Sequence, residues 1–319
     1  MRRNLGIDLL RGLSILYIVG FWHLLNYTRV IHNYNNIITY RITWIVLATF
    51  VLISGYFLGG KYINQHTLFA FYKKRLKRIY PPYFIAIFVF TILGLSDKIT
   101  SIKAILSISM FIRPAPRTLW FITMLLFFYL MSPLFISLSR QCVIQYLLLY
   151  TSLLCILLGY EYASNWLFNY YYLDIRVAVY LAPFMTGVYI SNNDIAKNKT
   201  KFILFGAIIA FSISCYFNSD NYGMNLLYSI PMVTIVPLLL FLFFSQLTIE
   251  SLNAQRIIIF LSTASYFMYL FHRPFYIAIK KVYFPSSPIP QLLFLFIICL
   301  PVIIVASFVM QKIYDNMLK

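Results

Sequence analysis

Residues 290–311 read PQLLFLFIICLPVIIVASFVMQ, a stretch that carries no charged side chain. A helix needs about 20 mostly apolar residues to cross the hydrocarbon core of a bilayer, and this stretch is long enough. Similar apolar segments recur along the chain back to residue 7, and hydrophobic residues make up 61% of the 319 residues against 11% for charged ones. This composition excludes a soluble enzyme with a single membrane anchor.

Ten segments are long and apolar enough to be membrane spans. The connections between them are short, polar and rich in Asn, Pro or Lys, and no linker marks a second domain. We expect an all-α, polytopic integral membrane protein with about ten transmembrane helices, a single domain over residues 1–319 and no appended extracytoplasmic domain. The predicted spans are residues 7–27, 41–60, 80–97, 118–138, 145–160, 177–192, 202–217, 226–246, 257–274 and 290–311.

The chain is strongly basic, with 26 Lys and Arg residues against 8 Asp and Glu residues. In a membrane protein such an excess indicates orientation and contact with anionic lipids, so we expect membrane lipids and no nucleic acid as partners. With the N-terminus in the cytoplasm, fifteen basic residues fall on the inner side and ten on the outer side. The dense run KKRLKR at residues 73–78 favours this orientation, because basic clusters near span ends resist translocation. Both termini are then cytoplasmic.

Arg11 lies inside the first predicted span, one to two turns from its start. A charged side chain inside a span costs roughly 2.5–3.5 kcal/mol on insertion scales, so an intramembrane arginine is a functional candidate. The alternative is that Arg11 extends to the inner headgroups, which its early position permits. Asp8, three residues earlier, lies on the same helix face, and we expect it to neutralise Arg11 in part.

His23 lies near the other end of the same span. Imidazole titrates near neutrality, so it can take a proton from an alcohol and return it, or act as a nucleophile. A lone histidine at a membrane boundary is more often a satisfied polar residue than a catalyst. Its pairing with Arg11 in one helix strengthens the catalytic interpretation.

Five landmarks follow one another along the chain: GIDLLRGLSIL at residues 6–16 with His23, FVLISGYFL at residues 50–58, RLKRIYPPY at residues 75–83, LWF at residues 119–121 and SYFMYLFHRP at residues 265–274. None is specific alone, but together they cover nearly the whole chain. Taken in this order, they resemble the landmarks of the acyltransferase family 3 membrane proteins.

The resemblance implies O-acylation, usually acetylation, of a cell-surface polysaccharide or lipid-linked sugar in the inner, cytoplasmic membrane. Acetyl-CoA or another acyl-CoA would be the donor substrate, with no permanently bound cofactor and no metal. The family's essential arginine and histidine match Arg11 and His23. Its cytoplasmic Arg-x-x-Arg, associated with donor binding, matches Arg75 and Arg78. The acceptor sugar, the acyl chain and the oligomeric state stay open.

One feature departs from the family pattern, which has an offset of eleven between the arginine and the histidine. Eleven steps of about 100° return to nearly the same helix face, but the offset here is twelve. In a regular helix His23 would be rotated about 100° from that alignment. We therefore predict a helix distortion between Leu16 and His23, at Gly20, that absorbs the extra residue, because single-turn π-bulges are frequent at functional sites.

The basic run also has a physical rationale of its own. Arginines at positions 75 and 78 project from one helix face, and Lys74 and Lys77 extend that positive surface toward polyanions such as the phosphates of coenzyme A. The alternative is a positive anchor on anionic lipid, and both roles are compatible. Pro81 and Pro82 follow, where we expect the third span to begin.

Four further residues are supporting candidates. Ser54, next to Gly55, would let a backbone or a ligand approach closely, although close helix packing is the simpler interpretation. Trp120 suits stacking on a sugar or anchoring at the interface. Tyr269 and His272 belong to the fifth landmark, and His272 would orient the acceptor or His23, or serve an interfacial structural role.

Two other functions fit the same sequence. A transporter or exporter of glycan intermediates would also be basic, with many spans and aromatic outer loops, but the broken-helix repeats typical of transporters are not visible. The second alternative is an inactive family member that serves assembly, since the extra residue before His23 alters the motif. The four cysteines, scattered singly at positions 142, 155, 215 and 299, do not have the paired spacing of a metal site.

Overall fold

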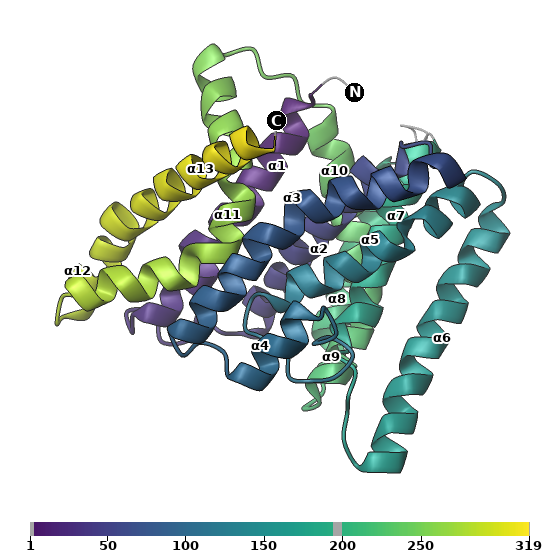
Figure 1. Cartoon of the computed structure of the whole chain (residues 1–319), viewed down its shortest axis with the longest axis horizontal. Helices are drawn as coiled ribbons and strands as arrows, with labels where there is room; N and C mark the ends of the chain where they lie inside the picture. The colour runs from purple at the N-terminus through teal and green to yellow at the C-terminus, as the bar shows by residue number, and fades with distance from the viewer. Residues whose placement is uncertain (1–2, 194–199, 319) are drawn as a thin grey trace. The chain divides into compact units, whose positions relative to one another are not determined.

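A computed structural model describes residues 3–193 and 200–318, which form helices joined by turns and loops, with no strand in this part of the chain (Figure 1). The all-α prediction is confirmed. The helices are α1 (Leu5–Tyr17), α2 (Ile37–Gly59), α3 (Gln65–Ile92), α4 (Lys98–Ile105), α5 (Trp120–Ser139), α6 (Val143–Phe168), α7 (Arg176–Asn192), α8 (Thr200–Tyr216), α9 (Tyr222–Tyr228), α10 (Ile230–Ser245), α11 (Leu252–Val282), α12 (Pro288–Phe294) and α13 (Leu300–Met317). Short π or 3₁₀ segments extend some of them: η1 (Ile18–His23), η2 (Leu25–Tyr27) and η4 (Leu295–Cys299).

Each of the ten predicted segments overlaps a helix, but not every helix is long and apolar enough to cross a membrane by itself. Among the described residues six helices meet that standard, or seven if α9 and α10, bent by 48°, form one broken span. The protein is a multi-pass membrane protein, and the predicted count of about ten spans is not confirmed. The three predicted segments outside this group lie on α3, α7 and α8.

Helix α3 differs from its prediction. The predicted third span covers residues 80–97, whereas the helix begins at Gln65, continues through both prolines and ends at Ile92. A capping box between Asn64 and Thr67 starts the helix earlier. Each proline removes a single backbone bond, which helices of membrane proteins tolerate. The basic run is therefore helical and continuous with the apolar segment.

Short polar side chains begin several of the helices. Each accepts a hydrogen bond from a backbone N–H of the first turn, which is otherwise without a partner in the helix. The capping residues are Asn4 for α1, Asn64 for α3, Asp97 for α4, Asn221 for α9 and Ser251 for α11.

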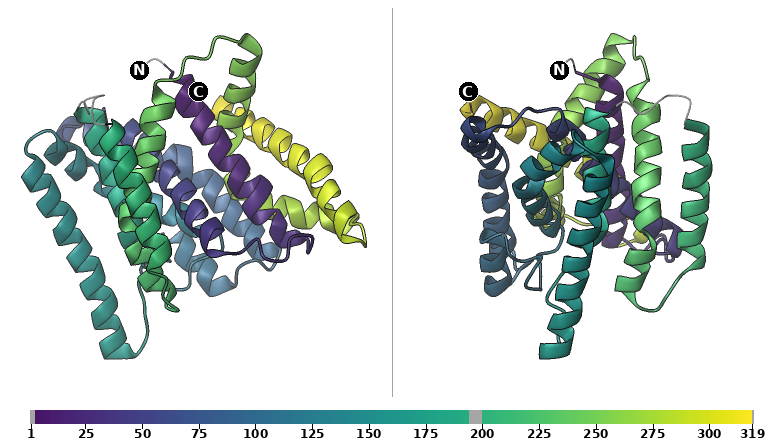
Figure 2. Two further views of the ribbon diagram at one scale, coloured as in Figure 1. Left: turned by 180° about the vertical axis from the view of Figure 1, so that it is seen from behind. Right: turned by 90° about the vertical axis from the view of Figure 1, so that its right-hand side faces the viewer.

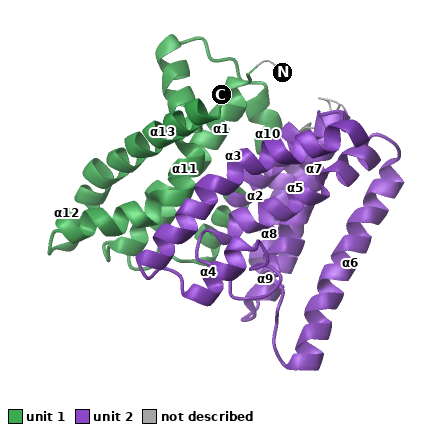
Figure 3. Cartoon of the chain, viewed as in Figure 1, with its two compact units in different colours: residues 1–46, 240–319 green, residues 47–239 purple. Residues whose placement is uncertain are grey.

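The chain forms two compact units, residues 1–46 with 240–319 and residues 47–239 (Figure 3). In the first unit, α11 packs against α1 and α13 (Figure 2). In the second unit, α5, α6 and α7 pack together, and α3 packs against α4 and α5. Only 11% of the apolar stretch of α6 that could cross a membrane is buried inside the protein, so most of this helix is available to lipid.

Small residues bring α2 and α7 together inside the second unit. A Cβ added at Gly55 would lie 2.2 Å from the carbonyl oxygen of Phe184, and one at Gly187 would lie 2.1 Å from that of Leu52. Both positions are in helices whose backbones touch, so only hydrogen fits there. Close packing of the two helices therefore explains why position 55, next to Ser54, is a glycine.

Candidate active site

The first span changes helix type before it reaches His23. Helix α1 ends at Tyr17, and residues Ile18–His23 form a π-helical turn that contains Gly20. The predicted distortion is confirmed. Because a π turn absorbs one residue, the offset of twelve between Arg11 and His23 acts as eleven, which returns His23 to within about 20° of the face of Arg11.

The guanidinium of Arg11 donates hydrogen bonds to residues of α11, so it does not depend on lipid headgroups for its partners. Its Nη2 donates to Oγ of Ser265 at 3.1 Å and to the carbonyl of Ser262 at 3.5 Å. Asp8 lies one turn away, with its Oδ1 3.7 Å from Nη1 of Arg11, as expected from their spacing. The buried Asp8 also pairs with Arg3, which donates in addition to Oγ of Ser262. A buried carboxylate needs such partners to be stable.

His23 meets a second histidine inside the same unit. Its Nδ1 lies 2.8 Å from Nε2 of His272, and the two rings are inclined by only 11°. On the far side, Nδ1 of His272 lies 2.9 Å from the carbonyl of Met268 and 3.0 Å from that of Tyr269. His272 is 0% exposed and His23 is 8% exposed, so both are buried and His23 is the less buried of the two.

The partners of Arg11 and His23 lie on one face of α11. Ser262, Ser265, Tyr269 and His272 follow each other at spacings of three, four and three residues, which a helix places in one stripe. Ser265 and His272 are two turns apart, about 10 Å along the axis. The structure thus brings Arg11 and His23 onto this stripe, which contains Tyr269 and His272, and Asp8 lies beside Arg11.

Tyr276 continues the stripe by one more turn and supports the π-helical segment. Its hydroxyl donates to the carbonyl of Val19 at 3.1 Å, inside the turn where the backbone hydrogen-bond pattern changes. Its ring also packs against Tyr27, with ring centroids 4.8 Å apart. The side chain therefore fixes the end of the first span that carries His23.

The predicted donor residues lie on α3 in the second unit. Arg78 is exposed, and Arg75 is partly buried, with its Nε buried and without a hydrogen-bond partner among the described residues. Lys61, in the connection before α3, belongs to the same cluster, since burial and the charges of Arg75, Lys74 and Arg78 lower its pKa to about 8. Arg140 donates to the carbonyl of Lys61 at 2.9 Å and so holds this connection in place.

Ser54 and Trp120 have surroundings that favour their structural interpretation. Ser54 is half-buried beside the α2–α7 contact described above. Trp120 is almost fully buried at the start of α5, and the guanidinium of Arg176 lies 3.8 Å from its ring centroid. Burial would raise the pKa of Asp174, but the charges of Arg176 and Arg113 hold it below its usual value, so Asp174 is an ionised partner of Arg176.

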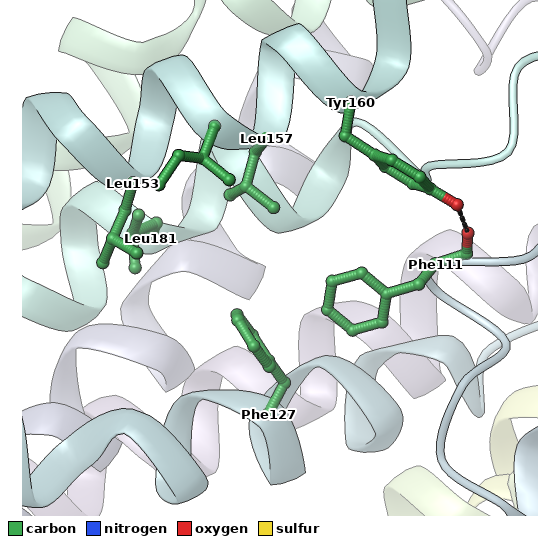
Figure 4. A pocket seen from close by; sticks show the side chains of 7 residues that line it. Phe111, Phe127, Leu153, Leu157, Tyr160 and Leu181 are labelled. Carbon is green, nitrogen blue, oxygen red and sulfur yellow. Dashed lines mark hydrogen bonds between the residues drawn. The ribbon is translucent and has the colours of Figure 1, made fainter. Parts of the chain in front are cut away.

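A separate pocket lies in the second unit and contains none of the predicted residues. Its volume is about 320 Å³, and the side chains that line it are mostly apolar (Figure 4). Tyr160 reaches across its edge and donates a hydrogen bond to the carbonyl of Phe111 at 2.9 Å. Such a lining suits a hydrocarbon chain and offers no acid or base for catalysis. The residues labelled in Figure 4 are Phe111, Phe127, Leu153, Leu157, Tyr160 and Leu181.

Several contributors were not predicted from the sequence. Ser262, Ser265 and Tyr276 hold Arg11 and the π turn, while Arg3 pairs with Asp8 and Lys61 joins the basic cluster. The helical spacing of the polar residues from Ser262 to Tyr276 was a usable signal, because polar side chains on one face of an apolar helix indicate a polar interface. Lys61 gave no such signal.

The helices and the buried stripe of α11 define an integral membrane protein with ionisable groups arranged inside a span. Comparison with protein families then identifies it more closely: the family described as an acyltransferase domain, acyltransferase family 3, matches residues 4–308. The chain belongs to this family and is a membrane acyltransferase. Comparisons with curated proteins and with solved structures give no match.

Proposed function

We propose that the protein transfers an acyl group, with acetyl as the foremost candidate, from cytoplasmic acyl-CoA to a hydroxyl of a cell-surface glycan or lipid-linked sugar. The observation that carries this proposal is the histidine pair, in which His23 meets His272 at 2.8 Å on the helix stripe that also holds Arg11. An imidazole held by a hydrogen bond to a second histidine suits removal of a proton from an acceptor hydroxyl, and His23 is the less buried of the two.

In the proposed reaction the acceptor hydroxyl gives its proton to His23 while its oxygen forms a bond to the thioester carbonyl carbon. The carbon–sulfur bond breaks, and the thiolate of coenzyme A takes the proton back, so the products are an ester and free coenzyme A. Arg11, whose partner Ser265 lies two helical turns from the partner of His23, would orient a donor phosphate. A transient acyl-histidine is the alternative course.

The donor side of the proposal is supported by the basic cluster of Lys61, Lys74, Arg75 and Arg78. Coenzyme A is a polyanion, and guanidinium groups bind phosphate through paired, charge-assisted hydrogen bonds. The buried Nε of Arg75, which has no hydrogen-bond partner among the described residues, supplies a donor for such a ligand.

The proposed location is the inner, cytoplasmic membrane, with both termini in the cytoplasm. In a variant with its four native cysteines replaced, a cysteine at Asn35 should react with an impermeant thiol reagent added outside intact cells. A cysteine at Gln65 should react only after the cells are opened. The reverse labelling pattern would refute the orientation and the cytoplasmic donor side.

The test of function uses purified protein in lipid nanodiscs with radiolabelled acetyl-CoA and an extract of lipid-linked glycans. We expect release of coenzyme A together with label in the glycan. His23→Ala should abolish transfer while donor binding stays nearly unchanged, and Arg11→Ala should weaken both. Full transfer by His23→Ala would refute the assignment of the base.

A transporter is the competing function, and the bent pair α9–α10 is the feature that favours it, because broken helices form the substrate sites of many transporters. Reconstituted vesicles separate the two functions. Movement of an unmodified lipid-linked sugar across the bilayer, with no acyl transfer from any acyl-CoA, would favour transport and overturn the proposed acyltransferase reaction.

A further inference from the structure

The hydrogen bonds of His272 determine which of its nitrogens carries the proton. Nδ1 of His272 lies within bonding distance of two backbone carbonyls, those of Met268 at 2.9 Å and Tyr269 at 3.0 Å. A carbonyl oxygen only accepts hydrogen bonds, so Nδ1 must be an N–H donor. In a neutral imidazole the other nitrogen, Nε2, is then an acceptor.

Both imidazoles are neutral in this arrangement. His272 is 0% exposed and His23 is 8% exposed, and no carboxylate of the described residues forms an ion pair with either ring. A buried charge without a counter-charge is costly, so a protonated pair is disfavoured at rest.

The two rings are also oriented for a direct bond between them. Their planes are nearly parallel, so the separation of the planes is no larger than about the distance between Nδ1 of His23 and Nε2 of His272, 2.8 Å, whereas the ring centroids are 4.7 Å apart. The rings are therefore displaced sideways and meet at their edges, where an N–H group of one ring faces a nitrogen of the other. Since Nε2 of His272 is the acceptor, Nδ1 of His23 must be the donor.

On the basis of the proposed acyl transfer, we propose that His272 is a positioning residue that fixes His23 in the tautomer with the proton on Nδ1. This tautomer leaves Nε2 of His23 unprotonated and makes it the atom that receives the acceptor's proton. When that proton arrives, Nδ1–H of His23 stays bonded to His272, whose own Nδ1–H stays bonded to the two carbonyls. The proton on Nε2 then passes to the coenzyme A thiolate as it leaves.

His272, on α11, takes the role of the group that orients a catalytic histidine. A carboxylate is the more familiar residue in that role. A neutral histidine orients its neighbour without adding a buried negative charge. Because His272 is fully buried, it acts through His23 and does not touch the substrate.

The direct test is ¹⁵N NMR of wild-type protein labelled at histidine and held in lipid nanodiscs. The chain has four histidines, and single substitutions assign their signals. We expect His23 and His272 each to show a protonated Nδ1 and an unprotonated Nε2, with coupling across the bond between the rings. A signal from protonated Nε2 of His23 would overturn the proposal, whether or not acyl transfer has been measured.

Kinetics supply the second test. His272→Leu removes the acceptor, and kcat should fall at least about a hundredfold with little change in KM for the acyl-CoA. His272→Gln can present an oxygen to Nδ1–H of His23 and should recover most of that loss, whereas the exposed His32→Leu should match wild type. Wild-type kcat in a folded His272→Leu protein would refute the positioning role. That result would leave the proposed acyl transfer intact. Failure of the wild-type protein to transfer any acyl group would refute the proposed function, and the NMR result alone would then decide the tautomer of His23.

Discussion

The hydroxyl of Tyr276 donates a hydrogen bond to the carbonyl of Val19, 3.1 Å away, and so links α11 to the π-helical turn that carries His23. Tyr276 lies one turn beyond His272 on the same face of α11. One face of α11 therefore contacts the π-helical turn twice: Tyr276 bonds its backbone at Val19, and His272 bonds the side chain of His23 at its end.

Removing this bond should loosen the turn without removing any reacting group. Tyr276→Phe keeps the ring packing on Tyr27 and deletes one hydrogen bond, worth about 0.5–1.5 kcal/mol. We expect kcat to fall by roughly two- to tenfold, with donor affinity unchanged. Tyr283→Phe, at an exposed position just after α11, is the matched control. A kcat equal to wild type in Tyr276→Phe would show that the turn is held by its own backbone.

Loss of the two arginines of α3 should weaken donor binding. Each charge-assisted contact to phosphate is worth roughly 1.5–3 kcal/mol, so Arg75→Ala with Arg78→Ala should reduce acyl-CoA affinity at least about a hundredfold. Calorimetric titration of purified protein measures this. The control is Arg256→Ala with Lys312→Ala, which removes two exposed basic residues of the other unit. Equal losses in both double variants would mean that net charge alone attracts the donor.

Donor affinity should depend on pH through Lys61. Burial and three neighbouring positive charges lower its pKa to about 8, so Lys61 is mostly protonated at neutral pH and loses its charge as the pH rises above that value. An anionic donor binds the protonated form better, so affinity should begin to fall near pH 8. In Lys61→Arg the decline should disappear, because arginine stays charged. Titrations at several pH values between about 7 and 9 test this, and a decline of the same size in Lys61→Arg would assign it to another group.

The close contact of α2 and α7 should be sensitive to a single methyl group. In Gly55→Ala the new Cβ would lie 2.2 Å from the carbonyl oxygen of Phe184, which forces the helices apart and should cost about 1–3 kcal/mol of stability. The control is Gly159→Ala on α6, where a Cβ meets nothing within 4 Å and alanine should be neutral or slightly stabilising. Unfolding in mixed detergent micelles compares the two. Equal stability of Gly55→Ala and wild type would show that the contact can relax.

Much of the first span could be derived from the sequence, because the features involved are local. Helical geometry relates the spacing of Arg11 and His23 to their faces. Against the offset of eleven in the family that the chain resembles, the offset of twelve predicted a distortion near Gly20, and a π turn occurs there. Helix ends were less accurate. The predicted third span ends at residue 97, whereas α3 ends at Ile92, and the polar cap at Asn64 starts this helix well before the predicted span.

By itself the sequence determined that this chain is an all-helical, multi-pass membrane protein, since hydropathy and helical period act over neighbouring residues. Arg11 and His23 became its foremost site candidates through their residue types inside one span and through the family resemblance. Only the tertiary structure decided what those side chains meet. His272 and Ser265 lie about 250 residues further along the chain, and nothing in a local pattern specifies which helix packs against the first. The partner is set by the packing of α1 and its π turn on α11, and that packing fixes the hydrogen bonds from which the tautomer of His23 follows.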